Sequence, residues 1–186
     1  MFIARLGLLG AVLVLASGCA QFVAPSYTPE YEALERLKRA GIVKVTVGTV
    51  GPKAEDATVN RLSLRLTGLK APRGTFADYL EGALVNDLKD ISVYDPKSDA
   101  RIDATILHNE IDVSGLSTGT GRMDVALVVT RGGQPRLSKT YSATTTFDSH
   151  LMANIAIPKG QAEYARLVSS LLAKVYGDAD FVASLK

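Results

Sequence analysis

Cysteine, tryptophan and excess charge are scarce in this sequence, and each scarcity excludes a class of function. The single cysteine, Cys19, cannot form a disulfide within the chain or supply a thiolate cluster for zinc. The formal net charge is +2 and there is no tryptophan, so the basic and aromatic surface of a nucleic-acid-binding protein is not expected. The longest apolar run, residues 6–16, is shorter than the roughly 20 residues that a membrane-spanning helix needs.

Residues 1–18 have the organisation of a secretory signal. A basic residue, Arg5, precedes the apolar run, and small residues follow it. The segment Leu15–Cys19 (Leu-Ala-Ser-Gly-Cys) resembles the lipobox of bacterial lipoproteins, in which the cysteine receives a diacylglyceryl group before cleavage. The alternative is an ordinary secretory signal with a cysteine nearby by chance. We favour lipidation because the only cysteine stands at the one position where this chemistry needs a thiol.

Lipidation of Cys19 determines the expected domain organisation and location. Residues 1–18 are removed, residues 19–28 form the lipidated tether, and residues 29–186 form a single domain. A diacylglyceryl group with an added N-acyl chain anchors a protein firmly, whereas one acyl chain does so only marginally. The cysteine is followed by Ala20-Gln21 and not by the aspartate that marks inner-membrane retention in enterobacteria. By resemblance to that sorting rule we expect the periplasm-facing side of the outer membrane, in preference to the inner membrane or the cell surface.

Capping residues and apolar spacing predict four helices. The first begins at Thr28-Pro29-Glu30, and the second begins at Thr75 with Asp78 as its capping-box partner. Pro158 begins a third, strongly amphipathic helix, and Asp178 caps a short final one. In the longer helices the apolar residues recur every three or four positions, which is typical of helices that cover one face of a core.

Alternating apolar and polar residues predict the strands. In the segment 101–113 the apolar residues change parity, which requires a β-bulge near Ile106–Asn109. Gly132-Gly133 predicts a hairpin. The pattern as a whole predicts an α+β fold, a two-layer sandwich of an antiparallel or mixed sheet with two or three amphipathic helices on one face. The expected strands cover residues 42–47, 62–66, 91–94, 101–113, 123–131 and 137–147, with residues 51–60 in a loop.

The segment Gly115–Gly119 has the Gly-x-Ser-x-Gly pattern of a serine-hydrolase nucleophile elbow, with Ser117 at its centre. That motif requires a helix directly after the serine, whereas a strand is predicted here. His150 is the only histidine downstream, and Asp124 or Asp148 would have to supply the acid. Two glycines around a serine are also common in turns between strands, so we expect no catalytic residue and no enzyme activity.

His108, Glu110 and Asp112 alternate along one strand face and could form a weak metal site. A solvated strand face is the more ordinary interpretation, because neither histidine has a partner at the spacing of metal ligands. We therefore expect no metal site. Since no glycine-rich loop precedes a helix as in a phosphate-binding loop, we also expect no cofactor.

The most distinctive predicted surface is a run of hydroxyl side chains on one face of the last strand. An ordinary exposed sheet face is the simpler explanation, because threonine is a strong strand former. The alternative is a face that binds a partner protein, a glycan or another strand. The residues of this possible binding face are Ser138, Thr140, Ser142, Thr144 and Thr146.

Five segments are characteristic of the fold, and none of them is a catalytic motif. They are the helix segment Phe76–Leu84, the Asp95-Pro96 turn, the strand end Gly119–Met123, the hairpin Arg131–Gly133 and the closing segment Tyr176–Phe181. Together they resemble the YajG family of small periplasm-facing lipoproteins of Gram-negative bacteria. A looser likeness extends to the auxiliary lipoproteins of ABC-type transporters and to the lipopolysaccharide-assembly lipoprotein, and it concerns the fold alone.

The expected function is that of a non-enzymatic, lipid-anchored binding or accessory module in a cell-envelope complex. Its expected partners are the membrane, through the acyl anchor on Cys19, and an envelope protein or polymer, with no nucleic acid. The first alternative is a lipid-handling accessory subunit of a transport system, which requires an apolar groove or cavity between the helices and the sheet. The second is a serine hydrolase, which requires Ser117 and His150 within hydrogen-bond reach.

Overall fold

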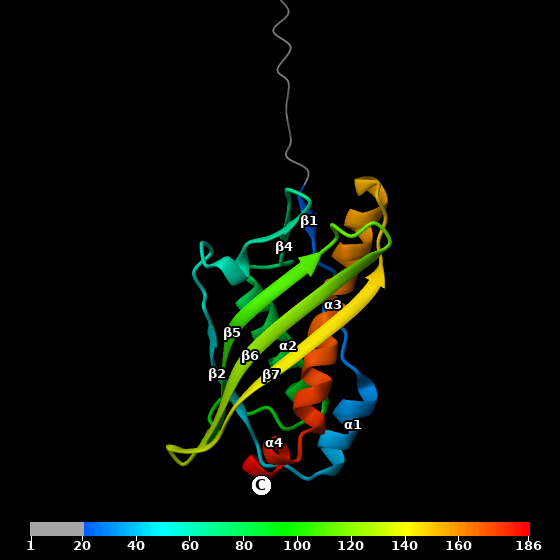
Figure 1. Cartoon of the computed structure of the whole chain (residues 1–186). Helices are drawn as coiled ribbons and strands as arrows, with labels where there is room; N and C mark the ends of the chain where they lie inside the picture. Colours follow the sequence, from blue (N-terminus) through cyan, green and yellow to red (C-terminus); the bar gives the residue numbers. More distant parts are fainter. Residues whose placement is uncertain (1–20) are drawn as a thin grey trace, which may run out of the picture.

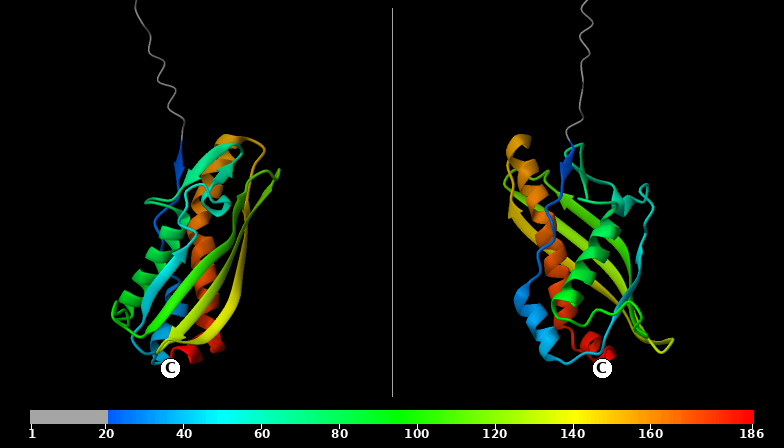
Figure 2. Two further views of the ribbon diagram at one scale, coloured as in Figure 1. Left: turned by 90° about the vertical axis from the view of Figure 1, so that its left-hand side faces the viewer. Right: turned by 180° about the vertical axis from the view of Figure 1, so that it is seen from behind.

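Helices and a four-stranded sheet form two layers in the part of the chain that the computed structural model describes, residues 21–186 (Figure 1). In the strand order β2-β5-β6-β7, β2 is parallel to β5 and the other pairs are antiparallel. Helices α2 (Phe76–Asp90) and α3 (Ala153–Gly177) cover one face of this sheet (Figure 2). The predicted α+β sandwich is therefore confirmed. Its strands are β2 (Thr46–Gly51), β5 (Ala100–Asp112), β6 (Thr118–Arg131) and β7 (Gln134–Asp148).

A small three-stranded sheet lies at one end of the sandwich, in the order β1-β4-β3. The expected strand 62–66 ends early, because the chain turns at Arg65 and Leu66, which have positive φ angles of 50° and 70°. Leu66 is therefore fully exposed and does not face the core, contrary to the alternation in the sequence. The strands are β1 (Phe22–Val23), β3 (Leu62–Leu64) and β4 (Thr67–Lys70), and a 3-10 helix, η1 (Thr58–Asn60), precedes β3.

The predicted helix starts are confirmed where a side-chain cap determines them. Thr75 and Asp78 form the expected capping box of α2, and Asp178 caps α4 (Ala179–Ser184). α3 begins at Ala153 and not at Pro158, which lies inside the helix. Proline is tolerated there because only the carbonyl of the exposed Asn154 loses its helical donor.

The first helix, α1 (Tyr31–Arg39), begins later than expected. Its N-cap is Glu30, whose carboxylate accepts a hydrogen bond from the Ala33 amide at 3.0 Å, so the predicted cap at Thr28 is wrong. Leu34 and Leu37 are buried as predicted, but Tyr31 is 65% exposed. The apolar stripe of α1, which packs against α3, therefore lacks its expected first member.

The strand predictions differ from the structure mainly at the start of the sheet. β2 begins at Thr46, and Val45 forms only an isolated bridge with Tyr94, so neither 42–47 nor 91–94 is a full strand. The bulge in β5 is confirmed by a register shift between Ile106 and His108. It leaves Leu107 exposed and turns the apolar residues on both of its sides into the core. The hairpin at Gly132-Gly133 is also confirmed.

Residues 19–28 were expected to form a tether outside the domain. From Phe22 onward, this segment is instead bound to the domain. β1 pairs with β4 in parallel, and the Ala24 amide donates to the Lys70 carbonyl at 2.8 Å. The Tyr79 hydroxyl donates to the Pro25 carbonyl at 2.9 Å. Cys19 itself and the predicted signal segment lie outside the described residues. The chain therefore becomes part of the fold three residues after the predicted lipidation position.

Side chains fill the space between the helices and the sheet. Tyr164 of α3 is fully buried and contacts Phe76 of α2, with ring centroids 4.6 Å apart. Leu167 and Leu171 of α3 and Leu127 of β6 belong to the same buried cluster, and each is at most 2% exposed. The lipid-handling alternative requires a groove at this place, and this packing counts against it.

Candidate binding face

The face of the four-stranded sheet opposite α2 and α3 carries the predicted hydroxyl residues. All five are exposed, whereas Tyr141 and Ala143, which alternate with them, are buried under the helices. Figure 2 shows the helices on one face of the sheet only, and no helix covers the face that carries the hydroxyl residues. Their partners in the neighbouring strand β6 are Thr120, Arg122, Asp124, Ala126 and Val128. We call these ten positions of β6 and β7 the outer face.

A strip of charged side chains crosses the outer face. Arg122 Nη2 lies 2.8 Å from Asp124 Oδ2, and this guanidinium keeps the pKa of Asp124 below its ordinary value. Asp124 is nearly buried, with its other oxygen unpaired among the described residues. In β5, Glu110 stands opposite Arg122 and His108 stands opposite Asp124. The charged strip therefore extends from β6 onto the neighbouring strand β5.

The three residues considered as a possible metal site, His108, Glu110 and Asp112, do not converge on one point. His108 Nε2 lies 3.1 Å from Glu110 Oε2, both on the exposed surface. Asp112 instead accepts a hydrogen bond from the Ser114 amide at 2.7 Å, and hydrogen bonding to the side chain and the amide of Ser114 lowers the pKa of its carboxyl. Within residues 21–186, no group of three or more histidine, cysteine, aspartate or glutamate side chains is placed to hold a metal ion.

Ser117 lies in the loop between β5 and β6 and is exposed. The next element is β6, so the strand-to-helix turn of a nucleophile elbow is missing here. The Ser117 carbonyl accepts from the Ser149 amide at 2.8 Å, which brings the loop close to His150. The His150 ring, however, accepts from the Met152 amide through Nδ1 at 3.0 Å. The arrangement supports a structural turn and gives the hydrolase alternative no support.

A buried aspartate, which the sequence reasoning did not identify, joins three distant segments. Asp87 of α2 is fully buried, and its Oδ2 accepts hydrogen bonds from the hydroxyls of Tyr27 and Tyr176, each at 2.7 Å. Burial raises the pKa of Asp87 to about 6, although both hydrogen bonds lower it. The cluster therefore ties the N-terminal segment that carries Tyr27 to α2 and to the end of α3.

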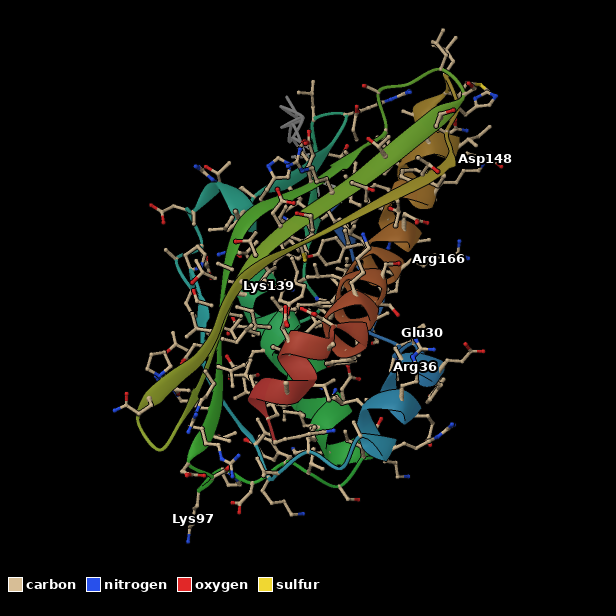
Figure 3. The ribbon with its side chains drawn as sticks, turned by 60° about the horizontal axis from the view of Figure 1, so that its bottom comes forward. Glu30, Arg36, Lys97, Lys139, Asp148 and Arg166 are labelled. Atoms are coloured by element: carbon tan, nitrogen blue, oxygen red, sulfur yellow. The ribbon has the colours of Figure 1, made fainter. Side chains whose placement is uncertain are left out.

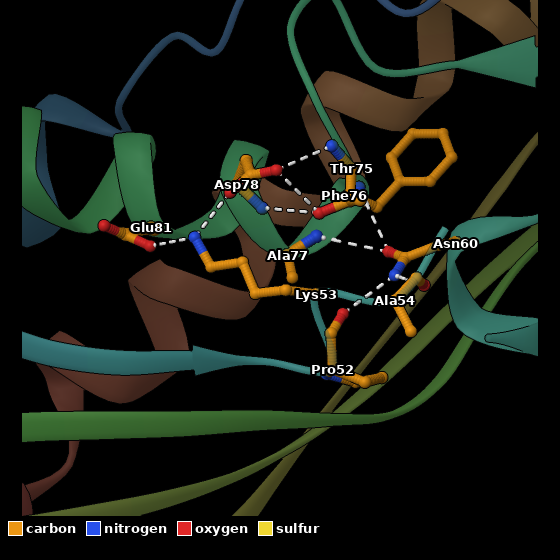
Figure 4. Close-up of polar contacts among 9 residues, drawn as sticks. All are labelled: Pro52, Lys53, Ala54, Asn60, Thr75, Phe76, Ala77, Asp78 and Glu81. Carbon is orange, nitrogen blue, oxygen red and sulfur yellow. Dashed lines mark hydrogen bonds and ion pairs between the residues drawn. The ribbon is translucent and has the colours of Figure 1, made fainter. Parts of the chain in front are cut away.

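The loop that precedes η1 is fastened to the start of α2 (Figure 4). The Asn60 side chain accepts from the Phe76 and Ala77 amides at 3.1 and 3.3 Å, so it satisfies two free amides of the first helical turn. Lys53 pairs with Asp78 and Glu81 in the same close-up. Each polar group here has a structural partner, and the cluster is best understood as a clamp for the loop.

Comparison with solved structures finds a protein with the same fold as this chain. Protein XCC0632 from Xanthomonas campestris, a DUF330 protein, is 14% identical and superposes with a TM-score of 0.61, covering 88% of this chain and 96% of that one. This chain shares its fold. A candidate lipoprotein from Caulobacter crescentus CB15 is 11% identical, with a TM-score of 0.48 over 83% of this chain and 96% of that one. No family model and no curated protein matches the sequence.

These comparisons do not identify the YajG family, so that resemblance stays a prediction. No helix among residues 21–186 is long and apolar enough to cross a membrane.

Proposed function

We propose that this protein is a non-enzymatic, lipid-anchored binding module of the bacterial cell envelope, and that its outer face binds an envelope protein or polymer. The observation that carries the proposal is that helices cover only one of the two faces of the four-stranded sheet. α2 and α3 cover one face of the sheet, whereas the other face presents five exposed hydroxyl side chains and a charged strip.

The chemistry of the outer face suits a polar partner. Each hydroxyl can both donate and accept a hydrogen bond, and serine and threonine are short, so little side-chain freedom is lost when they are covered. The Arg122 side chain is 59% exposed and donates to Asp124 through Nε and Nη2, so its guanidinium is both held in place and accessible. Such a surface favours a partner rich in hydroxyl, amide or carboxylate groups, as proteins and glycan polymers are.

The anchor follows from the lipobox at Leu15–Cys19 and from the position of β1. Because β1 begins only three residues after Cys19, lipidation would hold the folded domain directly against a membrane. A binding module held in this way meets its partner in two dimensions, which raises the effective concentration of both. The periplasm-facing side of the outer membrane remains our preferred location.

Site-specific photo-cross-linking in cells tests the proposal. A benzophenone amino acid replaces Thr140 or Thr144 on the outer face, and matched controls replace Glu32 or Glu35, which are exposed on α1. We expect cross-linked products from Thr140 and Thr144 only, and we expect Arg122→Ala to reduce them. A discrete band that proteases remove indicates a protein partner, and a heterogeneous product that glycan hydrolases remove indicates a polymer. Equal products from all four positions, or none from the outer face, would contradict the proposal.

A further inference from the structure

Exposed leucine side chains gather at one end of the molecule. Leu66, Leu116 and Leu151 are 101%, 72% and 67% exposed, and Met152 beside Leu151 is 52% exposed. They lie in three separate connections, between β3 and β4, between β5 and β6, and between β7 and α3. In Figure 1 these connections lie together at the upper end of the sandwich. We call the three leucines and Met152 the apolar tips.

One arginine holds the three connections together. The Arg65 guanidinium donates to the Val113 carbonyl at 2.9 Å and to the His150 carbonyl at 2.7 Å, and it also reaches the Leu151 carbonyl. Ser149 adds a second link, because its amide donates to the Ser117 carbonyl at 2.8 Å. Since Arg65 directly precedes Leu66, these hydrogen bonds hold together the backbones of the three connections that carry the apolar tips.

The described chain also begins at this end. β1 lies at the same end as the three connections in both views of Figure 2, and Val23 of β1 is itself 45% exposed. Cys19 precedes Phe22 by three residues, and three extended residues span at most about 10 Å. A lipid on Cys19 therefore forces this end of the domain to within about 10 Å of the bilayer surface. The outer face runs along β6 and β7, from Thr120 and Thr146 near this end to Val128 and Ser138 near the hairpin.

We infer that the apolar tips insert into the membrane interface as a second contact beside the lipid anchor. This inference rests on the lipidation of Cys19 in the proposed function. Leucine side chains that would otherwise face water gain by burial at the boundary between headgroups and acyl chains. Because the contact is apolar, salt does not weaken it as it weakens a polybasic contact. With β1 and the apolar tips at the membrane, the strands of the outer face run away from the surface toward the hairpin at Gly132-Gly133, which lies at the opposite end of the sandwich (Figure 1).

Fluorescence depth measurement on the lipidated protein tests this inference. Lipidation consumes the only native thiol, so a cysteine introduced by Leu66→Cys, Leu116→Cys or Leu151→Cys is the sole site for a nitrobenzoxadiazole label. Matched controls are Tyr31→Cys, a similarly exposed position on α1, and Lys97→Cys. Figure 3 shows Lys97 at the end of the molecule opposite the three connections. Each protein is reconstituted into vesicles of phosphatidylethanolamine and phosphatidylglycerol, with and without nitroxide-labelled lipid, and isolated by flotation.

We expect the labels at all three tips to shift to shorter emission wavelengths and to be quenched by nitroxide lipid, equally at low and high salt. The labels at Tyr31 and Lys97 should remain in water and unquenched. Protein that floats with vesicles while the tip labels remain unquenched would overturn the inference and leave the lipid anchor intact. Protein that does not float would overturn the anchor itself, and the inference with it.

Discussion

Removing the Asp87 carboxylate is predicted to change how stability depends on pH. The pKa of this buried group is raised from 3.8 to about 6, because burial outweighs its two tyrosine hydrogen bonds. The folded state then binds more protons than the unfolded state between these values, so stability falls as pH rises through them. The difference corresponds to about 3 kcal/mol of unfolding free energy, which is present at low pH and lost by about pH 7.

Asp87→Asn removes this titration and keeps an oxygen that can accept both tyrosine hydroxyls. We expect its unfolding free energy, relative to the native sequence, to rise by about 3 kcal/mol between about pH 3 and pH 7. The amide adds donors that lack partners, and this cost is the same at every pH, so it cancels from the change. Urea unfolding followed by far-ultraviolet circular dichroism at several pH values measures it, and the absence of tryptophan makes dichroism the better signal.

Two further variants serve as controls, one next to Asp87 in the sequence and one at its hydrogen-bond partner. Asn86→Ala, at an exposed position of the same helix, should give a difference from the native sequence that does not change with pH. Tyr176→Phe removes a hydrogen bond that lowers the pKa of Asp87, so the loss of stability should move to higher pH. Parallel stability curves for Asp87→Asn and the native sequence would refute the reasoning, because they would mean that Asp87 titrates alike in both states.

The same unfolding assay checks three further variants. Thr75→Ala removes the α2 cap shared with Asp78 and should lower stability by about 1 kcal/mol. Gly160→Ala places a Cβ 2.4 Å from a methyl of Val113 and should lower stability by about 1 to 3 kcal/mol. Gly82→Ala, with open space around it inside α2, should raise stability by up to about 1 kcal/mol. A gain from Gly160→Ala would mean that α3 does not pack closely on β5.

The features that could be predicted from the sequence are those determined by a few neighbouring residues. The capping box at Thr75 needs only Asp78 three positions on, and the bulge after Ile106 follows from a change of parity within one strand. The exposure of the hydroxyl residues, such as Thr140, follows from alternation with Tyr141 in the same way. Each of these signals lies within one element, so no knowledge of the tertiary contacts is needed.

The features that were missed depend on partners far away in the chain. Phe22 forms a strand only because Leu69 lies opposite it, and a two-residue strand has no periodicity to detect. Asp87 offered a weak signal, since it falls on the buried stripe of α2, but its partners Tyr27 and Tyr176 are 60 and 89 residues away. The apolar tips likewise become one surface only when tertiary folding brings three connections together.

Mass spectrometry of the protein extracted from bacterial membranes tests the central claim most directly. The account predicts that the first peptide of the mature chain begins at Cys19, lacks residues 1–18 and carries a diacylglyceryl group on the cysteine sulfur. A mature chain that begins elsewhere, or a Cys19 with a free thiol, would contradict it.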